Sequence, residues 1–282
     1  MKRSEREMYN KQFFIDEFKR LGLKQTDTVF VHSSYKQIAG NEGIEGGAET
    51  LIDAFIEYFG EQGLVVFPAM SWKLGYLVND NGETRSPALG AADGFYEYGS
   101  NFDVRETPCD YLGIIPELFR KREGVVRSLC PTSSVAAYGK DARAFCEGHE
   151  RAETPLNWDS PWGRLYERGA KILFLGTTMA CNTFLHVVED HASLPGLLDD
   201  YVWNFTVTDY GGRVFPVSFK RHVPHHNHYY IKVEPELCER GIAKRVTFGS
   251  AASHIVDARS EADYILRKLK EDPYLFYPEY NK

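Results

Sequence analysis

The sequence predicts an α/β fold with a central mixed sheet, and three observations support this. A buried strand, a glycine-rich loop, an amphipathic helix and a second buried strand follow one another within residues 28–70, the pattern of a βαβ unit. A further apolar strand at 171–176 leads directly into a helix. Alternating apolar residues around the turn DYGG (209–212) predict an antiparallel hairpin, which would form a carboxy-terminal extension. We expect residues 1–282 to fold as a single domain.

The individual elements follow from hydrophobic spacing and from end signals. Phe13, Phe14, Phe18 and Leu21 recur at helical spacing, so the first 25 residues should contain a helix that Gly22 ends. The other expected elements are a strand at 28–34, a helix at 48–60, a strand at 64–70, a helix at 111–122, the apolar segment 133–139, a helix near 140–147, the strand at 171–176, a helix at 183–191, the hairpin within 201–222 and a closing helix at 260–271. Residues 71–110 are rich in Gly, Asn, Asp and Pro, which predicts a long functional loop.

Composition is that of a soluble globular protein, with 43% apolar and 26% charged residues. The net charge of −7 argues against a nucleic-acid partner. No apolar run is long enough to span a membrane, and the amino terminus lacks the apolar core of a signal peptide, so we expect a cytoplasmic protein. The five scattered cysteines contain no CxxC pair, which disfavours disulfides and zinc knuckles. The oligomeric state stays open, a homodimer included.

The segment NTFLHVVED (182–190) carries the most informative histidine. If the helix begins at Asn182 or Thr183, both good caps, His186 shares a face with Glu189 three residues on and Asp190 four on. A carboxylate bonded to one ring nitrogen would fix the tautomer and leave the other nitrogen to accept a proton. Three interpretations compete: a core histidine, a metal ligand and a general base.

The metal interpretation fails on geometry, so we expect no metal site. His191 follows His186 by five residues, about 140° around the helix, so the two rings would not converge on one ion. The histidines at 222, 225, 226 and 228 follow a hairpin, where near neighbours usually point to different faces. Cys181, on the strand-to-helix turn, is a rival nucleophile, although burial is the commoner fate of a lone cysteine.

Five stretches, in order, resemble the aminoglycoside 3-N-acetyltransferase family from about residue 12 to residue 270. They are VFVHSS with GGAETLIDAF, GLVVFPAMSW, RSLCPTSSVAAYG, SPWGRLYERGAKILFLGTTMACNTFLHVVED and VTFGSAASHIVDAR. The resemblance implies a fold unlike the GNAT acetyltransferases and direct transfer of an acetyl or short acyl group from acetyl-CoA to a primary amine of an aminoglycoside or amino sugar. It also implies that His186 is the general base and Glu189 its orienting residue, with Asp190 a solvated neighbour.

Coenzyme A carries a pyrophosphate, which binds backbone amides and helix amino termini. We therefore expect the cofactor at His32, Ser33 and Ser34, which end a strand, and at Gly46 and Gly47, which precede a helix. The resemblance adds Ser134, Ser160 and Gly163 to these contacts. Thr183 and the hydroxyls at 132–134 are candidates to stabilise the oxyanion.

Departures from the family gather on the amine side, where we expect Asp110, Thr183 and Asn227 to contact the substrate. Cys130 and Ser133 stand where relatives carry histidines, Asp110 stands in place of an arginine, and Asn227 replaces an aspartate that helps hold a cationic aminoglycoside. Our hypothesis is therefore an amino-sugar acceptor. Alternatives are a nucleotide-linked amino sugar of glycan biosynthesis rather than an antibiotic, a non-catalytic protein that binds CoA or a sugar, and a cysteine hydrolase that uses Cys181.

Overall fold

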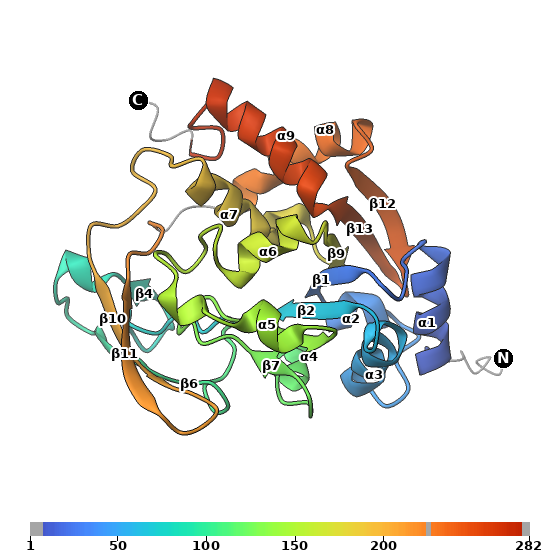
Figure 1. The fold of residues 1–282 in the computed structure, drawn as a ribbon, viewed down its shortest axis with the longest axis horizontal. Helices are drawn as coiled ribbons and strands as arrows, with labels where there is room; N and C mark the ends of the chain where they lie inside the picture. The colour runs from blue at the N-terminus through green and yellow to red at the C-terminus, as the bar shows by residue number, and fades with distance from the viewer. Residues whose placement is uncertain (1–7, 224–226, 278–282) are drawn as a thin grey trace.

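The computed structural model describes residues 8–223 and 227–277, and its main feature is a mixed sheet (Figure 1). Within these residues the sheet has seven strands in the order β12-β13-β9-β1-β2-β8-β7. Their bounds are β1 Thr28–Ser33, β2 Leu64–Pro68, β7 Val126–Arg127, β8 Val135–Gly139, β9 Lys171–Leu175, β12 Ala243–Phe248 and β13 Ala251–Asp257. β9, β1 and β2 are parallel and the outer strands are antiparallel, which confirms the predicted mixed sheet and its βαβ unit.

Helices cover both faces of this sheet. The helices on one face are α1 Lys11–Arg20, α2 Tyr35–Ala39, α3 Ala48–Phe59 and α4 Ile114–Phe119. The helices on the other are α5 Ala142–Cys146, α6 Pro161–Glu167, α7 Phe184–His191, α8 Glu234–Glu239 and α9 Ala258–Glu271. β1 shows the consequence: Val29 and Val31 enter one core and Phe30 the other, and all three are fully buried. The middle of a strand that is buried on both faces is apolar at every position, as it is here at residues 29–31.

The hairpin predicted within 201–222 forms, but it builds its own sheet. β10 Trp203–Thr208 pairs antiparallel with β11 Val214–Phe219, and β6 Asn101–Asp103 joins β10 in parallel. The side chain of Asp209 closes the turn by accepting from the amides of Gly211 and Arg213. The antiparallel strands that extend the central sheet are instead β12 and β13. The sequence pattern of β12 is weak because the adjacent exposed residues Lys244 and Arg245 interrupt the alternation of apolar and polar residues.

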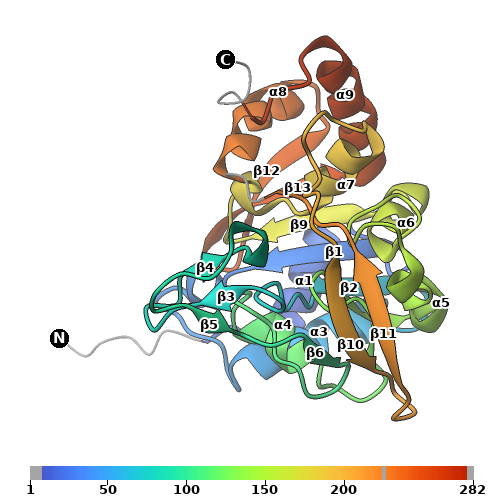
Figure 2. The same cartoon turned by 90° about the vertical axis from the view of Figure 1, so that its left-hand side faces the viewer.

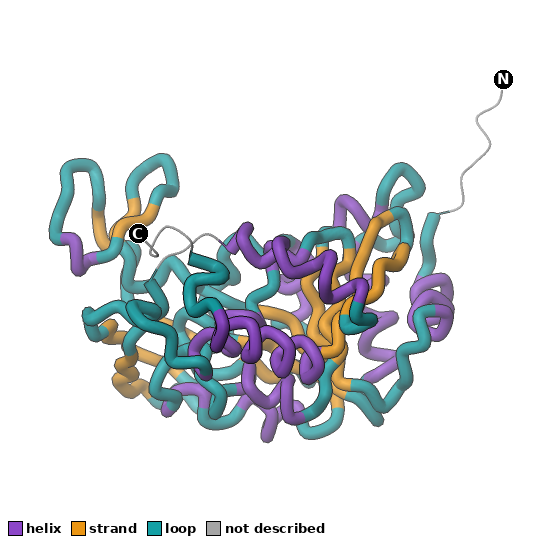
Figure 3. The backbone as a smooth tube through the Cα atoms, turned by 90° about the horizontal axis from the view of Figure 1, so that it is seen from above, coloured by secondary structure: helices purple, strands orange, loops and turns teal. Residues whose placement is uncertain are grey.

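Residues 71–110 are not one continuous loop. β3 Leu77–Val78, β4 Thr84–Arg85 and β5 Tyr96–Glu97 form a small sheet, with a 3-10 turn, η1 Pro87–Leu89, between β4 and β5. We call residues 77–97 the flap. It projects from the rest of the molecule (Figures 2 and 3).

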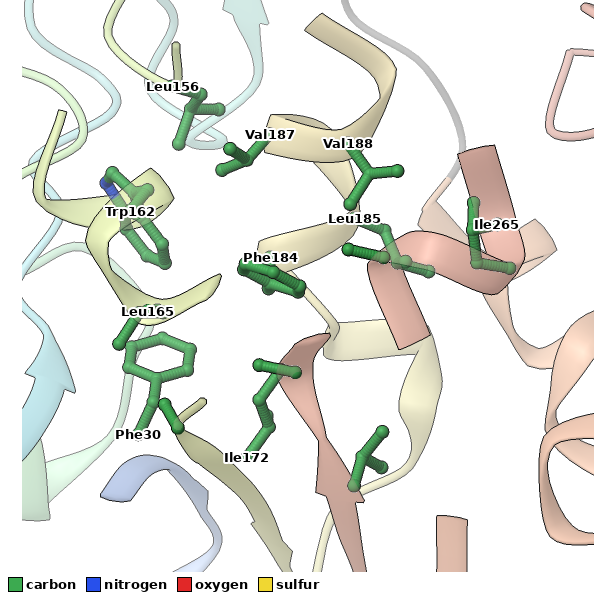
Figure 4. Packing of buried hydrophobic residues seen from close by; sticks show 14 of the residues in the cluster. Phe30, Leu156, Trp162, Leu165, Ile172, Phe184, Leu185, Val187, Val188 and Ile265 are labelled. Atoms are coloured by element: carbon green, nitrogen blue, oxygen red, sulfur yellow. The ribbon is translucent and has the colours of Figure 1, made fainter. Parts of the chain in front are cut away.

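α7 begins where β9 ends, through the 3-10 turn η3 Met179–Cys181. Thr183 is the N-cap but its hydroxyl caps no helix amide, and Asn182 instead donates to Glu261 of α9 at 2.9 Å, so the expected cap bond does not form. Packing holds the helix in its place: Phe184 lies over Ile172, Leu185 faces Ile265, and Trp162 stands beside Phe184 (Figure 4).

Among the described residues, no helix combines the length and the apolarity that crossing a membrane requires.

Candidate active site

The ends of the parallel strands gather many of the predicted site residues at one edge of the central sheet. β1 ends at Ser33, β2 leads into Met70, and β9 leads through η3 into Thr183. β8 runs antiparallel to β2, so Ser134, which precedes β8, lies at the same edge. Open α/β sheets place their ligand sites at this edge.

A cleft of about 1080 Å³ opens there. Met70, Ser133, Thr183 and His186 line it from the sheet edge and from α7. The flap lines it with Glu83 and Arg85 among others, and Asp199, Arg221 and His222 come from the segments that flank the hairpin. The cleft therefore joins a sheet-edge region, where Thr183 and His186 lie, to a polar region that the flap lines.

His186 borders this cleft while most of its ring is buried, with 9% of the residue exposed. Its Nδ1 lies 2.7 Å from the hydroxyl oxygen of Tyr230, and that hydroxyl donates to Oε2 of Glu189 at 2.5 Å. Nδ1 and the same Oε2 are 3.3 Å apart. Tyr230, from the 3-10 helix η4 Asn227–Val233, is fully buried, as is Glu189. The predicted pair of His186 and Glu189 thus exists, with a tyrosine hydroxyl bonded to both.

Burial governs the protonation of this group. Desolvation, assisted by the neighbouring His222, lowers the pKa of His186 to about 3, and burial with the adjacent Glu189 raises the pKa of Tyr230 well above its ordinary value. At neutral pH the imidazole is uncharged and the tyrosine keeps its proton. A neutral imidazole is the form that can accept a proton.

A second histidine lies beside the first. The rings of His186 and His222 are 5.8 Å apart, and Nε2 of His222 bonds Asp190 at 2.9 Å. Thr154 donates to the same oxygen of Asp190 at 2.6 Å. The expectation that Asp190 is a solvated neighbour is therefore wrong, because its carboxylate is taken up by two partners.

A stacked cation forms part of the polar region of the cleft. The guanidinium of Arg221 lies 4.4 Å from the ring centre of Tyr76 and 4.5 Å from that of Trp203. It donates to the backbone carbonyl oxygens of Trp72, at 2.9 Å, and Leu74, at 3.3 Å. This stacking holds the side chains of Arg221 and Tyr76 in place where they line the cleft.

The predicted strand-end cofactor residues hold unused polar groups. Among the described residues, neither Nε2 of His32 nor the hydroxyls of Ser33 and Thr177 has a hydrogen-bond partner, although all three atoms are buried. Burial lowers the pKa of His32 to about 3. Ser34 is the N-cap of α2 but its side chain makes no cap bond. Buried polar groups normally find partners, so this edge suits a polar ligand.

Gly46 and Gly47 lie before α3, both with positive φ, and α3 has no side-chain cap. The first amides of this 12-residue helix are thus open to an anion. Neither glycine lines the cleft, so they can contribute only to a cofactor that extends beyond it.

The other predicted cofactor residues are occupied within the protein. The hydroxyl of Ser134 is fully buried, donates to the carbonyl of Ala69 at 2.6 Å and accepts from Arg127 at 2.9 Å. Ser160 caps α6 by accepting from the amide of Trp162 and donates to the carbonyl of Asn157.

Gly163 has a packing role as well. A Cβ at this position would lie 1.8 Å from the carbonyl oxygen of Trp158, so the glycine lets α6 approach the preceding turn. Local structure is therefore sufficient to explain the SPWG motif.

Of the predicted amine-side residues, Thr183 lines the cleft and Asp110 does not. Asp110 is 7% exposed and accepts from the amide of Lys73, which holds the chain that follows Met70. The side chain of Asn227 lies outside the described part, as do residues 225 and 226 and the side chain of His228.

The rival chemistries find little support. Cys181 is exposed but does not line the cleft, and desolvation raises the pKa of its thiol, which disfavours the thiolate. His191 stacks on Trp158 at 4.3 Å, while the ring of His186 stacks edge-on against Tyr230. Within the described residues no three His, Cys, Asp or Glu side chains are grouped as metal ligands would be.

Sequence reasoning missed Tyr230 and Arg221, and it predicted residues 71–110 as a functional loop without the strands of the flap. Tyr230 follows His186 by 44 residues and lies in a 3-10 helix, so no helical spacing links the two. The flap strands are two residues long, too short to show an alternating pattern.

The fold and the site define an α/β enzyme with a buried histidine at the carboxyl edge of its sheet. The family model for aminoglycoside 3-N-acetyltransferase matches residues 30–270. Aminoglycoside N(3)-acetyltransferase VII of Streptomyces paromomycinus is 31% identical over 264 residues, which cover 89% of this chain and 88% of that protein. The chain belongs to the aminoglycoside 3-N-acetyltransferase family and is an acetyl-CoA-dependent N-acetyltransferase.

Solved structures agree on the fold, which is not that of the GNAT enzymes. The YokD protein from Bacillus subtilis superposes with a TM-score of 0.78 at 25% identity, over 94% of this chain and 95% of that one. The binary complex of AAC-IIIb with CoASH superposes with a TM-score of 0.75 at 23% identity, over 93% of this chain and 96% of that one.

Proposed function

We propose that this protein transfers an acetyl group directly from acetyl-CoA to a primary amine of an amino sugar, with His186 as the general base. One observation carries the proposal: a neutral, largely buried imidazole borders the cleft and has a carboxylate 3.3 Å behind its Nδ1. Because acetyl-CoA is kept inside cells, we place the reaction in the cytoplasm.

The proton accounting is simple. An amine near neutral pH is mostly ammonium and has no lone pair, so the acceptor must lose a proton before or during attack. The nitrogen lone pair then forms a bond to the thioester carbon, the C–S bond breaks, and CoA leaves as a thiolate. The ammonium proton goes to solvent, and the neutral amine that attacks loses a second proton as the amide forms; His186 takes this second proton and can pass it to the thiolate.

Glu189 makes this transfer easier. A buried imidazolium alone would be costly, which is why the pKa of His186 is low in the resting site. Once His186 is protonated, the Glu189 carboxylate at 3.3 Å becomes its counter-charge. The attraction exists only when the proton has moved, so it stabilises the transition state more than the ground state.

The tetrahedral intermediate needs donors near its oxyanion. Of the candidate hydroxyls, Ser133 and Thr183 line the cleft beside His186, whereas Thr132 and Ser134 are fully buried. We assign the oxyanion to the hydroxyls of Ser133 and Thr183.

The strand-end polar groups fit the cofactor. The unpartnered atoms of His32, Ser33 and Thr177 would bond polar atoms of CoA, and the uncapped start of α3 would bind a phosphate. These contacts orient the thioester at the edge from which α7 begins. Positioning of two bound substrates should supply much of the acceleration.

The acceptor has three candidate classes. Related structures hold gentamicin, apramycin and sisomicin, which favours an aminoglycoside. In this chain, however, Glu83 and Asp199 in the cleft lining are balanced by Arg85 and Arg221. Polycations are held by acidic sites, so the two arginines favour an amino sugar of low positive charge, with a nucleotide-linked amino sugar as second candidate.

The test is release of free CoA thiol from acetyl-CoA with aminoglycosides, simple amino sugars of low charge and nucleotide-linked amino sugars in parallel. We expect turnover with at least one class. No thiol release with any of the three, or equal release without any amine, would contradict amine transfer and favour a binding protein or a hydrolase. A Cys181→Ala variant should keep full activity, and its inactivity would restore the cysteine hydrolase.

A further inference from the structure

The hydroxyl of Tyr230 is bonded on both sides, and its single hydrogen fixes the direction of both bonds. The hydroxyl of Tyr230 donates to Oε2 of Glu189, which uses its hydrogen. The second bond must then run from Nδ1–H of His186 to the hydroxyl oxygen, over 2.7 Å. A neutral imidazole carries one N–H, so its lone pair is on Nε2.

The other tautomer, with the hydrogen on Nε2, is disfavoured because the Tyr230 hydroxyl has only one hydrogen to donate. If Nδ1 carried the lone pair, it would compete with Glu189 for the one hydroxyl hydrogen. A buried carboxylate that lost this donor would forgo a charge-assisted bond, which costs more than losing a neutral one. The wild-type structure therefore selects one tautomer.

The hydroxyl is also firmly placed. Tyr230 is fully buried, and its ring meets that of Phe276 edge-on at 4.8 Å. Glu189 and His186 come from α7, whereas Tyr230 comes from η4. Among the described residues, the titratable side chains Glu189 and Tyr230 lie at Nδ1 of His186. His222, which is bonded to Asp190, lies beside the ring.

We propose that Tyr230 is a positioning residue that holds His186 in the Nδ1–H tautomer and links it to Glu189. The proposal rests on the base role of His186. In this arrangement Glu189 orients the imidazole through a tyrosine hydroxyl, and Nε2 is the nitrogen that removes the amine proton. Tyr230 itself touches neither substrate.

The main variant is Tyr230→Phe, which removes the hydroxyl and keeps the ring packing. Tyr58→Phe is a matched control, because Tyr58 is also buried and its hydroxyl also makes one 2.7 Å bond, to the carbonyl of Leu23 on the opposite face of the sheet. Each variant removes one buried hydroxyl, but only the hydroxyl of Tyr230 lies beside His186.

The decisive readout is the tautomer of His186, observed by nitrogen NMR of histidine-labelled protein and assigned by subtraction with His186→Ala. We expect an Nδ1–H tautomer in the wild type and in Tyr58→Phe, and a mixture in Tyr230→Phe. We also expect Tyr230→Phe to lose about tenfold in kcat, the loss of one such bond, with an unchanged KM for acetyl-CoA.

An Nε2–H tautomer in the wild type would overturn the proposal, as would wild-type kcat and tautomer in Tyr230→Phe. If that variant fails to fold, the wild-type tautomer decides alone. His186→Ala separates the two claims: full activity there removes the base role, whereas an inactive His186→Ala with a fully active Tyr230→Phe removes only the positioning role.

Discussion

Two buried histidines of this protein are bonded to hydroxyls, and only one borders the cleft. His149 is 1% exposed, with Nδ1 2.8 Å from the hydroxyl of Ser128 and Nε2 2.8 Å from the carbonyl of Pro155. Burial lowers its pKa to about 4, much as it lowers the pKa of His186 to about 3. Burial and a hydroxyl partner thus do not distinguish a base from a structural histidine.

What differs is the second partner and the access. The protein uses both ring nitrogens of His149, and the ring holds the chain at Pro155, which lines the cleft. His186 borders the cleft itself and has Glu189 within 3.3 Å to balance a gained proton. A carboxylate behind the ring and a cleft in front are thus the features that favour His186 over His149 as the proposed base.

The largest contrast should come from His186→Ala. We expect kcat for acetyl transfer to fall by at least ~100-fold, with little change in the thermal midpoint, because the lost group acts in proton transfer. Steady-state thiol release and thermal unfolding measure the two quantities. Activity within a few fold of wild type would remove the distinction between the two histidines.

The oxyanion assignment predicts the next largest effect. Thr183→Val or Ser133→Ala should each lower kcat by about 10-fold to 100-fold, since each removes one donor to the developing charge. Thr28→Val is the control, because Thr28 is buried at the start of β1, away from the strand end at the site, and does not line the cleft. Equal losses in all three variants would indicate a structural effect.

His149→Ala should reverse the pattern. Loss of the ring leaves the Ser128 hydroxyl without an imidazole partner and opens a cavity, so we expect the free energy of unfolding to fall by about 2–4 kcal/mol. Activity per folded molecule should stay within a few fold of wild type. Denaturant unfolding measures the first, and a large drop in kcat at full folding would place His149 in the chemistry instead.

The pH dependence of the free energy of unfolding should report on three buried histidines together. The pKa values of His32, His149 and His186 lie at about 3, 4 and 3, below the unfolded value of 6.5, so unfolding takes up protons between about pH 6.5 and 4. Stability should therefore fall as the pH drops below 6.5. A thermal midpoint that is flat from pH 7 to 5 would contradict these pKa values.

The smallest effect concerns the support of α7. Burial raises the pKa of Glu261 to about 8 from 4.5, so unfolding releases a proton between about pH 4.5 and 8 and stability declines as the pH rises through this range. Glu261→Gln keeps an acceptor for Asn182 and removes the titration. We expect its thermal midpoint to decline less than that of wild type from pH 6.5 to 8; identical declines would assign the alkaline loss elsewhere.

Sequence alone could predict the elements whose pattern is local. β9 and the strands of the βαβ unit are apolar runs, and α7 and the helix of the βαβ unit have apolar residues at helical spacing. His186 and Glu189 share one face of α7, so their proximity follows from helical spacing alone. The first helix, the closing helix and the hairpin were predictable for the same reason.

The rest depends on contacts between distant segments. Tyr230 contacts His186 only because η4 packs against α7. The hydroxyl of Ser134 is hydrogen-bonded to Ala69 and Arg127 only because β8 pairs with β2. A motif match cannot show whether a hydroxyl faces a ligand or a backbone carbonyl.

The base role of His186 can be tested by a structure of the complex with CoA and an amine acceptor. We expect the acceptor nitrogen within hydrogen-bond distance of Nε2 of His186, with the cofactor sulfur beside Ser133 and Thr183. A cofactor bound away from this cleft, or a ring that no substrate atom reaches, would contradict that role.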